Sequence, residues 1–215
     1  MLAVAANASD TTAFYSGSLS SPTDTFTLSV NLATAGTVSV QTYGFGGGVN
    51  AEGNTVAPGG FDPLVALFDS SGNIIDGTSD VLVNYYANPS YQGCPPAGLV
   101  QIGTGAGSMV CGDVFLSFSL AAGDYTLLLS DADYIPDALV DPGSTNLADG
   151  FTDFTGGVFQ TCNVPASGDF ACITPSADYA FDLTVPATPV PEPATFTLLA
   201  SALGAGWLGR KRRRH

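Results

Sequence analysis

Acids are the most abundant ionisable side chains of this 215-residue protein. The chain carries 17 Asp and two Glu. All five basic side chains are consecutive, and the single His follows them: Arg210, Lys211, Arg212, Arg213, Arg214 and His215. Residues 1–209 therefore contain no imidazole, guanidinium or lysine ammonium group. This excludes His-dependent nucleophilic catalysis, lysine Schiff bases and arginine clamps on phosphate, so we expect no enzymatic activity.

The charge balance also excludes a nucleic-acid partner. The formal net charge is −14, and affinity for a phosphate backbone depends on Lys and Arg. Paired carboxylates, as in glycosidases, are the one catalytic chemistry that this composition leaves open. A secreted hydrolase is therefore kept as a second alternative function.

A cluster of aspartates follows a strongly apolar segment and is the candidate metal site. Asp131, Asp133, Asp137 and Asp141 lie within eleven residues, and Ca²⁺ prefers such oxygen ligands. The segment lacks the Gly and the final Glu of an EF-hand loop. Two interpretations stay open, a Ca²⁺ site and a solvated acidic loop, of which the second is favoured.

Four cysteines predict two disulfides, because their number is even and the chain has the composition of an exported protein. They are Cys94, Cys111, Cys162 and Cys172. Spacing leaves three pairings open, and we favour the local pairs Cys94–Cys111 and Cys162–Cys172. A zinc site is disfavoured because the chain has no CxxC motif and no His near these cysteines.

The C-terminal segment has three parts. Residues 187–193 form a Pro-rich linker that ends in Val190, Pro191, Glu192 and Pro193. Residues 194–209 are uncharged and mostly apolar, and the basic tail 210–214 follows. As a helix, this run would cover about 24 Å of a hydrocarbon core near 30 Å. Residues 194–215 are thus expected to form one transmembrane helix whose basic end stays on the cytoplasmic side.

This order of motif, apolar run and basic tail resembles the PEP-CTERM sorting signal of Gram-negative bacteria. The resemblance implies recognition by an exosortase, transient anchoring in the inner membrane and cleavage near residues 191–193. It also implies delivery to the outer surface or to an exopolysaccharide matrix. A permanent single-span anchor is the alternative interpretation.

The first eight residues are expected to be a partial signal peptide. Residues 2–6 are apolar, and Ala6-Asn7-Ala8 matches the small-x-small pattern before a cleavage site. An ordinary frayed N-terminus is the alternative. Residues 9–186 then form one extracellular domain of a length that suits a single core.

Alternating apolar residues predict that this domain is all-β, either a β-sandwich or a jelly roll. Two hairpins are expected, at residues 26–40 and 114–129. Further strands are expected at residues 64–69, 73–75, 157–161 and 178–185. The segments DTFTLSVNLATAGTVSV and DVFLSFSLAAGDYTLLL share their period and turn residues, so they are expected to hold related places in two sheets.

The body also resembles the DVUA0089 family of PEP-CTERM surface proteins, which are similar to pre-peptidase C-terminal β-sandwiches. The similarity rests on Asp24-Thr25-Phe26 and on residues 61–75, 120–130 and 147–151. It implies an extracellular β-domain without an assigned activity.

Three local patterns are ambiguous. Gly44-Phe45-Gly46-Gly47-Gly48 lacks the Lys of a phosphate loop and is interpreted as a loop tip. Asp69-Ser70-Ser71-Gly72 is interpreted as a hairpin turn. Six aromatic residues could form a polysaccharide-binding face, although such residues more often pack in the fold: Tyr43, Phe45, Tyr85, Tyr86, Tyr91 and Tyr134.

The sequence as a whole predicts a non-enzymatic exported protein of the cell surface or of a biofilm matrix. Its expected partners are an exosortase, the inner membrane during transit, and exopolysaccharide. The first alternative is a carbohydrate- or calcium-binding adhesive module.

Overall fold

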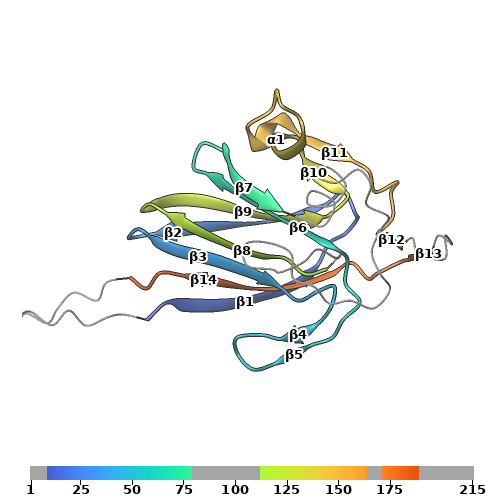
Figure 1. The fold of residues 1–215 in the computed structure, drawn as a ribbon, viewed down its shortest axis with the longest axis horizontal. Coiled ribbons are helices and arrows are strands. Elements are labelled where there is room, and N and C mark those ends of the chain that lie inside the picture. Colours follow the sequence, from blue (N-terminus) through green and yellow to red (C-terminus); the bar gives the residue numbers. More distant parts are fainter. Residues whose placement is uncertain (1–8, 79–111, 164–170, 189–215) are drawn as a thin grey trace, which may run out of the picture. The chain divides into compact units, whose positions relative to one another are not determined.

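Two antiparallel four-stranded sheets pack face to face and form the body of the protein (Figure 1). The computed structural model describes residues 9–78, 112–163 and 171–188. Asp10–Ala187 form one compact unit. The all-β prediction is confirmed, and the two packed sheets make this unit a sandwich.

The first sheet has the strand order β1 (Thr11–Ser18), β14 (Asp178–Val185), β3 (Gly36–Thr42) and β8 (Phe115–Leu120). The second sheet has the order β2 (Thr25–Leu32), β9 (Gly123–Asp131), β6 (Pro63–Asp69) and β7 (Ile74–Thr78). The smaller elements are β4 (Gly48–Val49), β5 (Thr55–Val56), β10 (Tyr134–Pro136), α1 (Asp137–Val140), the 3₁₀ turn η2 (Leu147–Asp149), β11 (Phe151–Asp153), β12 (Thr161–Asn163) and β13 (Ala171–Ile173).

The main core lies between the two sheets, where alternate residues of each strand point inward. The first sheet contributes Val38 and Val40 of β3 and Phe181 of β14, and the second contributes Leu127 and Leu129 of β9. All five are at most 1% exposed. Burial at this level is worth about 2 kcal/mol for each aliphatic side chain, so this layer is the main source of stability.

A second, smaller core lies on the outer face of the second sheet. Leu64, Phe68 and Leu128 point to this face and pack under Ile135 of β10 and Leu139 of α1. β6 is consequently buried on both faces. Figure 1 shows α1, β10 and β11 as a cap over this sheet. The segment that sequence patterns assigned to an acidic loop is therefore an apolar cap with aspartates on its turns.

The two hairpins predicted at residues 26–40 and 114–129 are wrong. β2 lies in the second sheet and pairs with β9, whereas β3 lies in the first sheet and pairs with β14 and β8. The turns at residues 33–35 and 121–122 each cross between the sheets. Alternation shows that a strand has one apolar face, but both a hairpin and a crossing arch satisfy that requirement.

The two arches stack on each other. β2 pairs with β9 from Thr25 opposite Ser130 to Leu32 opposite Gly123. β3 pairs with β8 from Gly36 opposite Leu120 to Gln41 opposite Phe115. The two similar segments therefore do not each lie in one sheet, as two hairpins would; each contributes one strand to both sheets.

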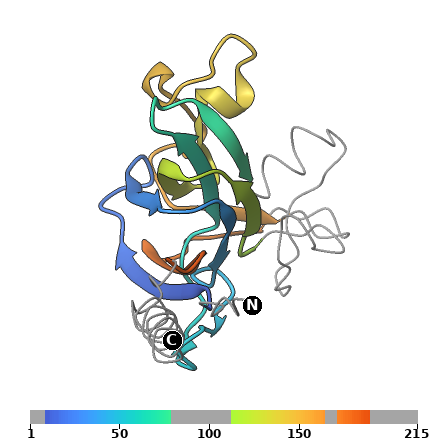
Figure 2. The same ribbon diagram turned by 90° about the vertical axis from the view of Figure 1, so that its left-hand side faces the viewer.

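Both ends of the folded unit lie at the end of the sandwich that carries the short turns. Thr11 of β1 is opposite Val185 of β14. A Cβ placed on Gly36, at the start of β3, would lie 2.4 Å from Cγ of Pro186. Figure 2 looks onto this end of the sandwich. We call it the short-turn end, because the arch turns and the β6–β7 turn lie there as well.

Other local predictions differ in outcome. The strands predicted at 64–69 and 178–185 correspond to β6 and β14, while β1 and the short helix α1 were not predicted. The strand predicted at 157–161 is wrong: residues 155–158 form a bend and turn, and β12 begins at Thr161. The predicted signal peptide and transmembrane helix lie outside the described residues. Within those residues, no helix is long and apolar enough to cross a membrane.

Leu127→Ala should lower the free energy of unfolding by about 2–5 kcal/mol, because it opens a cavity between the sheets. Thr37→Ala, at an exposed position of central strand β3, should change it by less than about 0.5 kcal/mol. Urea unfolding followed by circular dichroism measures both. Equal effects of the two substitutions would contradict the placement of Leu127 in the core.

Candidate functional site

The glycine-rich loop after β3 is held by a buried carboxylate. Oδ2 of Asp113 accepts a hydrogen bond from the Gly46 amide at 2.8 Å, and Oδ1 accepts one from the Phe45 amide at 3.2 Å. Oδ1 also accepts from the Thr42 hydroxyl at 2.9 Å. These amides form an anion-binding concavity like those that bind phosphate in other proteins, but here the anion is the protein's own Asp113.

A second buried carboxylate holds the next part of the same segment. Oδ2 of Asp182, on β14, accepts hydrogen bonds from the Tyr43 hydroxyl at 2.9 Å and from the Ala51 amide at 2.7 Å. Oδ1 of Asp182 is buried and has no hydrogen-bond partner among the described residues. Asp113 and Asp182 therefore fix both the glycine loop and the β4–β5 hairpin to the first sheet.

Burial determines how these groups titrate. Desolvation raises the pKa of Asp113 above its usual range, although hydrogen bonds from Gly46, Thr42 and Phe45 act in the opposite direction. Burial, together with the Asp182 carboxylate, raises the pKa of Tyr43 to about 12. Tyr43 consequently remains a hydrogen-bond donor over the whole physiological range of pH. The chemistry of this site is anchoring, because both carboxylates accept hydrogen bonds from backbone amides and side-chain hydroxyls of the protein itself.

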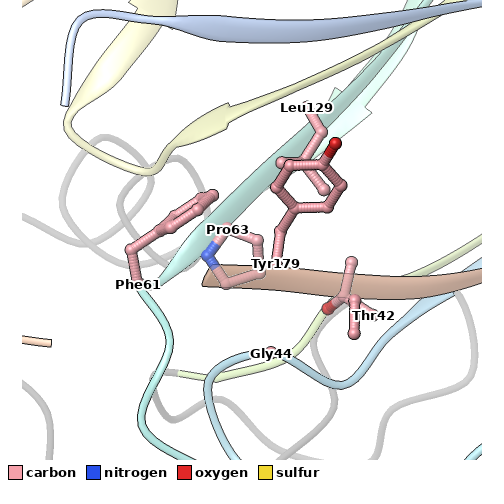
Figure 3. Close-up of a pocket in the computed structure, with 7 residues that line it drawn as sticks. Thr42, Gly44, Phe61, Pro63, Leu129 and Tyr179 are labelled. Atoms are coloured by element: carbon pink, nitrogen blue, oxygen red, sulfur yellow. The ribbon is translucent and has the colours of Figure 1, made fainter. Parts of the chain in front are cut away.

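A small hollow next to this network offers no room for a substrate. It is lined by Thr42, Gly44, Phe61, Pro63, Leu129, Tyr179 and Ala180 (Figure 3). The Tyr179 ring fills the space beside Pro63 and Leu129. The hollow is too narrow for a water molecule.

Three of the four candidate calcium ligands accept hydrogen bonds from nearby groups of the protein. Oδ1 of Asp131 accepts from the Asp133 amide at 2.9 Å, and Oδ1 of Asp141 accepts from the Gly143 amide at 2.9 Å. Oδ1 of Asp137 accepts from the Thr152 hydroxyl at 2.7 Å. Across the part of the chain that the structure describes, no three His, Cys, Asp or Glu side chains converge to hold a metal ion. The geometry thus adds no support to the calcium hypothesis.

The remaining turn prediction is confirmed. Oδ1 of Asp69 accepts from the Ser71 and Asn73 amides at 2.8 and 2.9 Å, which closes the turn between β6 and β7. Gly72 supplies the required positive φ of 82°. The hydrogen bonds from Asn73 lower the pKa of Asp69.

The candidate sugar-binding aromatics do not share one set of contacts. Tyr43 binds Asp182, whereas Tyr134 stacks on Phe151 in the cap with ring centroids 4.6 Å apart. Tyr85, Tyr86 and Tyr91 lie outside the described residues. Packing within the fold therefore accounts for Tyr43 and Tyr134.

Only one of the two predicted cysteine pairs lies within the described residues. Cys162 of β12 and Cys172 of β13 are register partners in an antiparallel pair. Residues opposite each other in such a pair have Cα atoms about 4.5–5.5 Å apart, which suits a disulfide. Cys94 and Cys111 lie outside the described residues, and both bridges stay predictions.

Sequence reasoning missed Asp113 and Asp182 as site residues. Asp182 interrupts the apolar alternation of β14 at a position that pattern alone assigns to solvent. Its burial depends on the β4–β5 hairpin. The sequence did contain one signal of its burial. Asp182 lies between the apolar residues Phe181 and Leu183, and residues 1–209 contain no basic side chain that could pair with it.

The sorting residues Val190, Pro191, Glu192 and Pro193 and the basic tail Arg210–Arg214 also lie outside the described residues. The sequence continues directly into them from β14 and Ala187. Residues 189–214 match the PEP-CTERM protein-sorting motif. This match supports the sorting-signal prediction and marks the protein for export, membrane transit and processing by an exosortase.

The search of curated proteins finds none that matches the chain. The resemblance of residues 9–186 to the DVUA0089 family is therefore not supported by a comparison.

Asp113→Asn should flatten the pH dependence of stability. Because the native pKa of Asp113 is raised, the folded state keeps a proton that the unfolded chain loses at a lower pH. The contribution of Asp113 to stability therefore falls as pH rises above about 4, the ordinary value for Asp. Melting temperatures of wild type and variant should diverge between pH 4 and neutrality. Asp124→Asn, at an exposed site, is the control, and parallel curves for all three proteins would refute the effect.

The double variant Cys162→Ala, Cys172→Ala should lose about 3 kcal/mol of stability if these residues form a bridge. Alkylation and intact-mass measurement before and after reduction should show no free thiol in the unreduced protein. Four thiols alkylated without reduction would contradict both predicted disulfides.

Proposed function

We propose that this protein is a non-enzymatic component of the cell surface or extracellular matrix. The PEP-CTERM motif at residues 189–214 carries the proposal, because it directs export and exosortase processing. The final location and the lack of catalysis go beyond that match. They are supported by the composition and the contacts of the body.

The contacts favour a stable display domain over an enzyme. The buried carboxylates Asp113 and Asp182 accept hydrogen bonds from backbone amides and hydroxyl groups of the protein itself. The hollow beside them holds no water-sized space. A general acid or base must reach a proton on a bound substrate within hydrogen-bond distance, and neither carboxylate is placed to do so.

The position of the sorting motif suits processing close to the folded unit. Four residues separate Val185, the end of β14, from Val190 of the motif. Even a fully extended chain of this length spans only about 18 Å. The processing enzyme must therefore approach the short-turn end, where the turns at residues 33–35 and 121–122 add little bulk.

The acidic surface suits the proposed destination. Every charged side chain in residues 1–209 is acidic, so mutual repulsion keeps the exported body soluble. Exopolysaccharide is the proposed matrix partner, and a neutral or cationic polymer would meet less electrostatic repulsion than an anionic one.

The triple variant Pro191→Ala, Glu192→Ala, Pro193→Ala should accumulate with its C-terminal segment intact. The wild type should lose that segment, because the substitutions remove the motif that the exosortase recognises. Intact-mass measurement of membrane and surface fractions from the producing bacterium reads out both forms. Thr188→Ala, just before the matched residues 189–214, is the control. Wild-type protein recovered from the cytosol with residues 189–215 attached would overturn the proposal.

A further inference from the structure

The edge strands of the two sheets differ in how they are protected. An edge strand exposes unpaired backbone N–H and C=O groups, and monomeric proteins usually block them with charges, prolines, bulges or a covering segment. β7, at one edge of the second sheet, has three such features. It is five residues long and contains Asp76, and its pairing with β6 shifts register between Leu67 and Phe68. A Cβ on its Gly77 would lie 2.8 Å from Leu139 of the cap, which shows how closely the cap covers it.

β1 and β2 form the opposite side of the sandwich and have none of these features. Each is eight residues long and pairs with one neighbour in an unbroken register. Their sequences, TTAFYSGS and TFTLSVNL, contain no charged residue and no proline. The Tyr15 and Phe26 rings, with centroids 6.5 Å apart, link the two strands across the core. The remaining edge strand, β8 of the first sheet, is also uncharged but has only six residues.

β1 is the more accessible of the two. Six of its eight residues are exposed, and only Phe14 and Tyr15 are partly buried. Among the described residues, β1 pairs with β14 alone. Its outer backbone groups therefore specify a partner of one kind, which is another extended strand.

We infer that β1 pairs antiparallel with β1 of a second copy of this protein, so that the first sheets of two copies join into one. Such a pairing is symmetric about a twofold axis, and the same strand serves both sides. The charge distribution favours a second copy. Two strongly acidic copies repel each other least when they make contact through the same uncharged strand of each copy.

The two Asp10 side chains do not oppose this pairing, whereas Asp178, opposite Ser18 on β14, adds repulsion at the ends of the paired strands. When the core-facing sides of the two joined sheets lie on the same side, even-numbered residues of one β1 lie opposite even-numbered residues of the other, and odd-numbered opposite odd-numbered. The twofold axis then passes beside Phe14 or beside Tyr15. Asp10 of one copy then lies near the far end of the partner strand, about 26 Å or more from Asp10 of the second copy. That distance exceeds the Debye length of about 10 Å at 0.1 M salt. Added salt should therefore strengthen the dimer by screening the rest of the body.

Sedimentation of the full chain in detergent, at low and high salt, tests the pairing. The wild type should dimerise, with tighter association at high salt. Ser16→Asp places two like charges within about 13 Å across the twofold axis and should weaken dimerisation by about tenfold. Thr37→Asp adds the same charge at an exposed position of central strand β3 and should leave the dimer unchanged. Circular dichroism checks that both variants are folded.

Hydrogen exchange of the wild type gives a readout that needs no variant. Amides of residues 11–18 should gain protection as protein concentration rises, while those of β7 should not. A monomer at every salt concentration overturns the inference, as does a dimer that Ser16→Asp leaves intact, which would point to association through residues 189–215. Protection of β1 only on addition of a peptide of residues 186–193 would assign the edge to that segment instead. None of these outcomes depends on whether the sorting motif is cleaved.

Discussion

The absence of basic side chains from residues 1–209 is the constraint on which the rest of the structure depends. A folded domain normally neutralises part of its buried carboxylates with Lys or Arg. Here Asp113 and Asp182 are stabilised by backbone amides and hydroxyl groups. Each carboxylate must therefore lie where a loop can supply those donors, and this requirement fixes the glycine loop and the β4–β5 hairpin against the first sheet.

The same constraint explains the cap. Its aspartates accept hydrogen bonds from nearby amides or hydroxyls, as Asp141 does from Gly143 and Asp149 does from Thr145 and Asn146. The carboxylates thus close turns on the surface, while Ile135 and Leu139 lie between those turns and the second sheet and pack against the sheet. A segment rich in acids can be an ordered layer of the fold because its charges and its apolar residues point in different directions.

Charge placement also links the fold to its destination. Acids are spread over turns and caps, cations are confined to residues 210–214, and β1 and β2 have no charge. Removal of the C-terminal segment by an exosortase would make the net charge of the remaining body more negative. The uncharged strands would then be the part of its surface best suited to contact another copy.

Sequence alone determined the all-β class, the limits of strands such as Asp178–Val185 and the PEP-CTERM motif, because each depends on local pattern or composition. Only the tertiary structure decided which strands are neighbours. Alternation along β2 and β3 fits a hairpin and an arch equally well, and packing against β9 and β8 selected the arch. Burial of Asp182 likewise depends on a hairpin more than 120 residues earlier in the chain. Such long-range contacts leave no periodic trace in the sequence, since one strand's pattern records the direction of the core but not the identity of its partner.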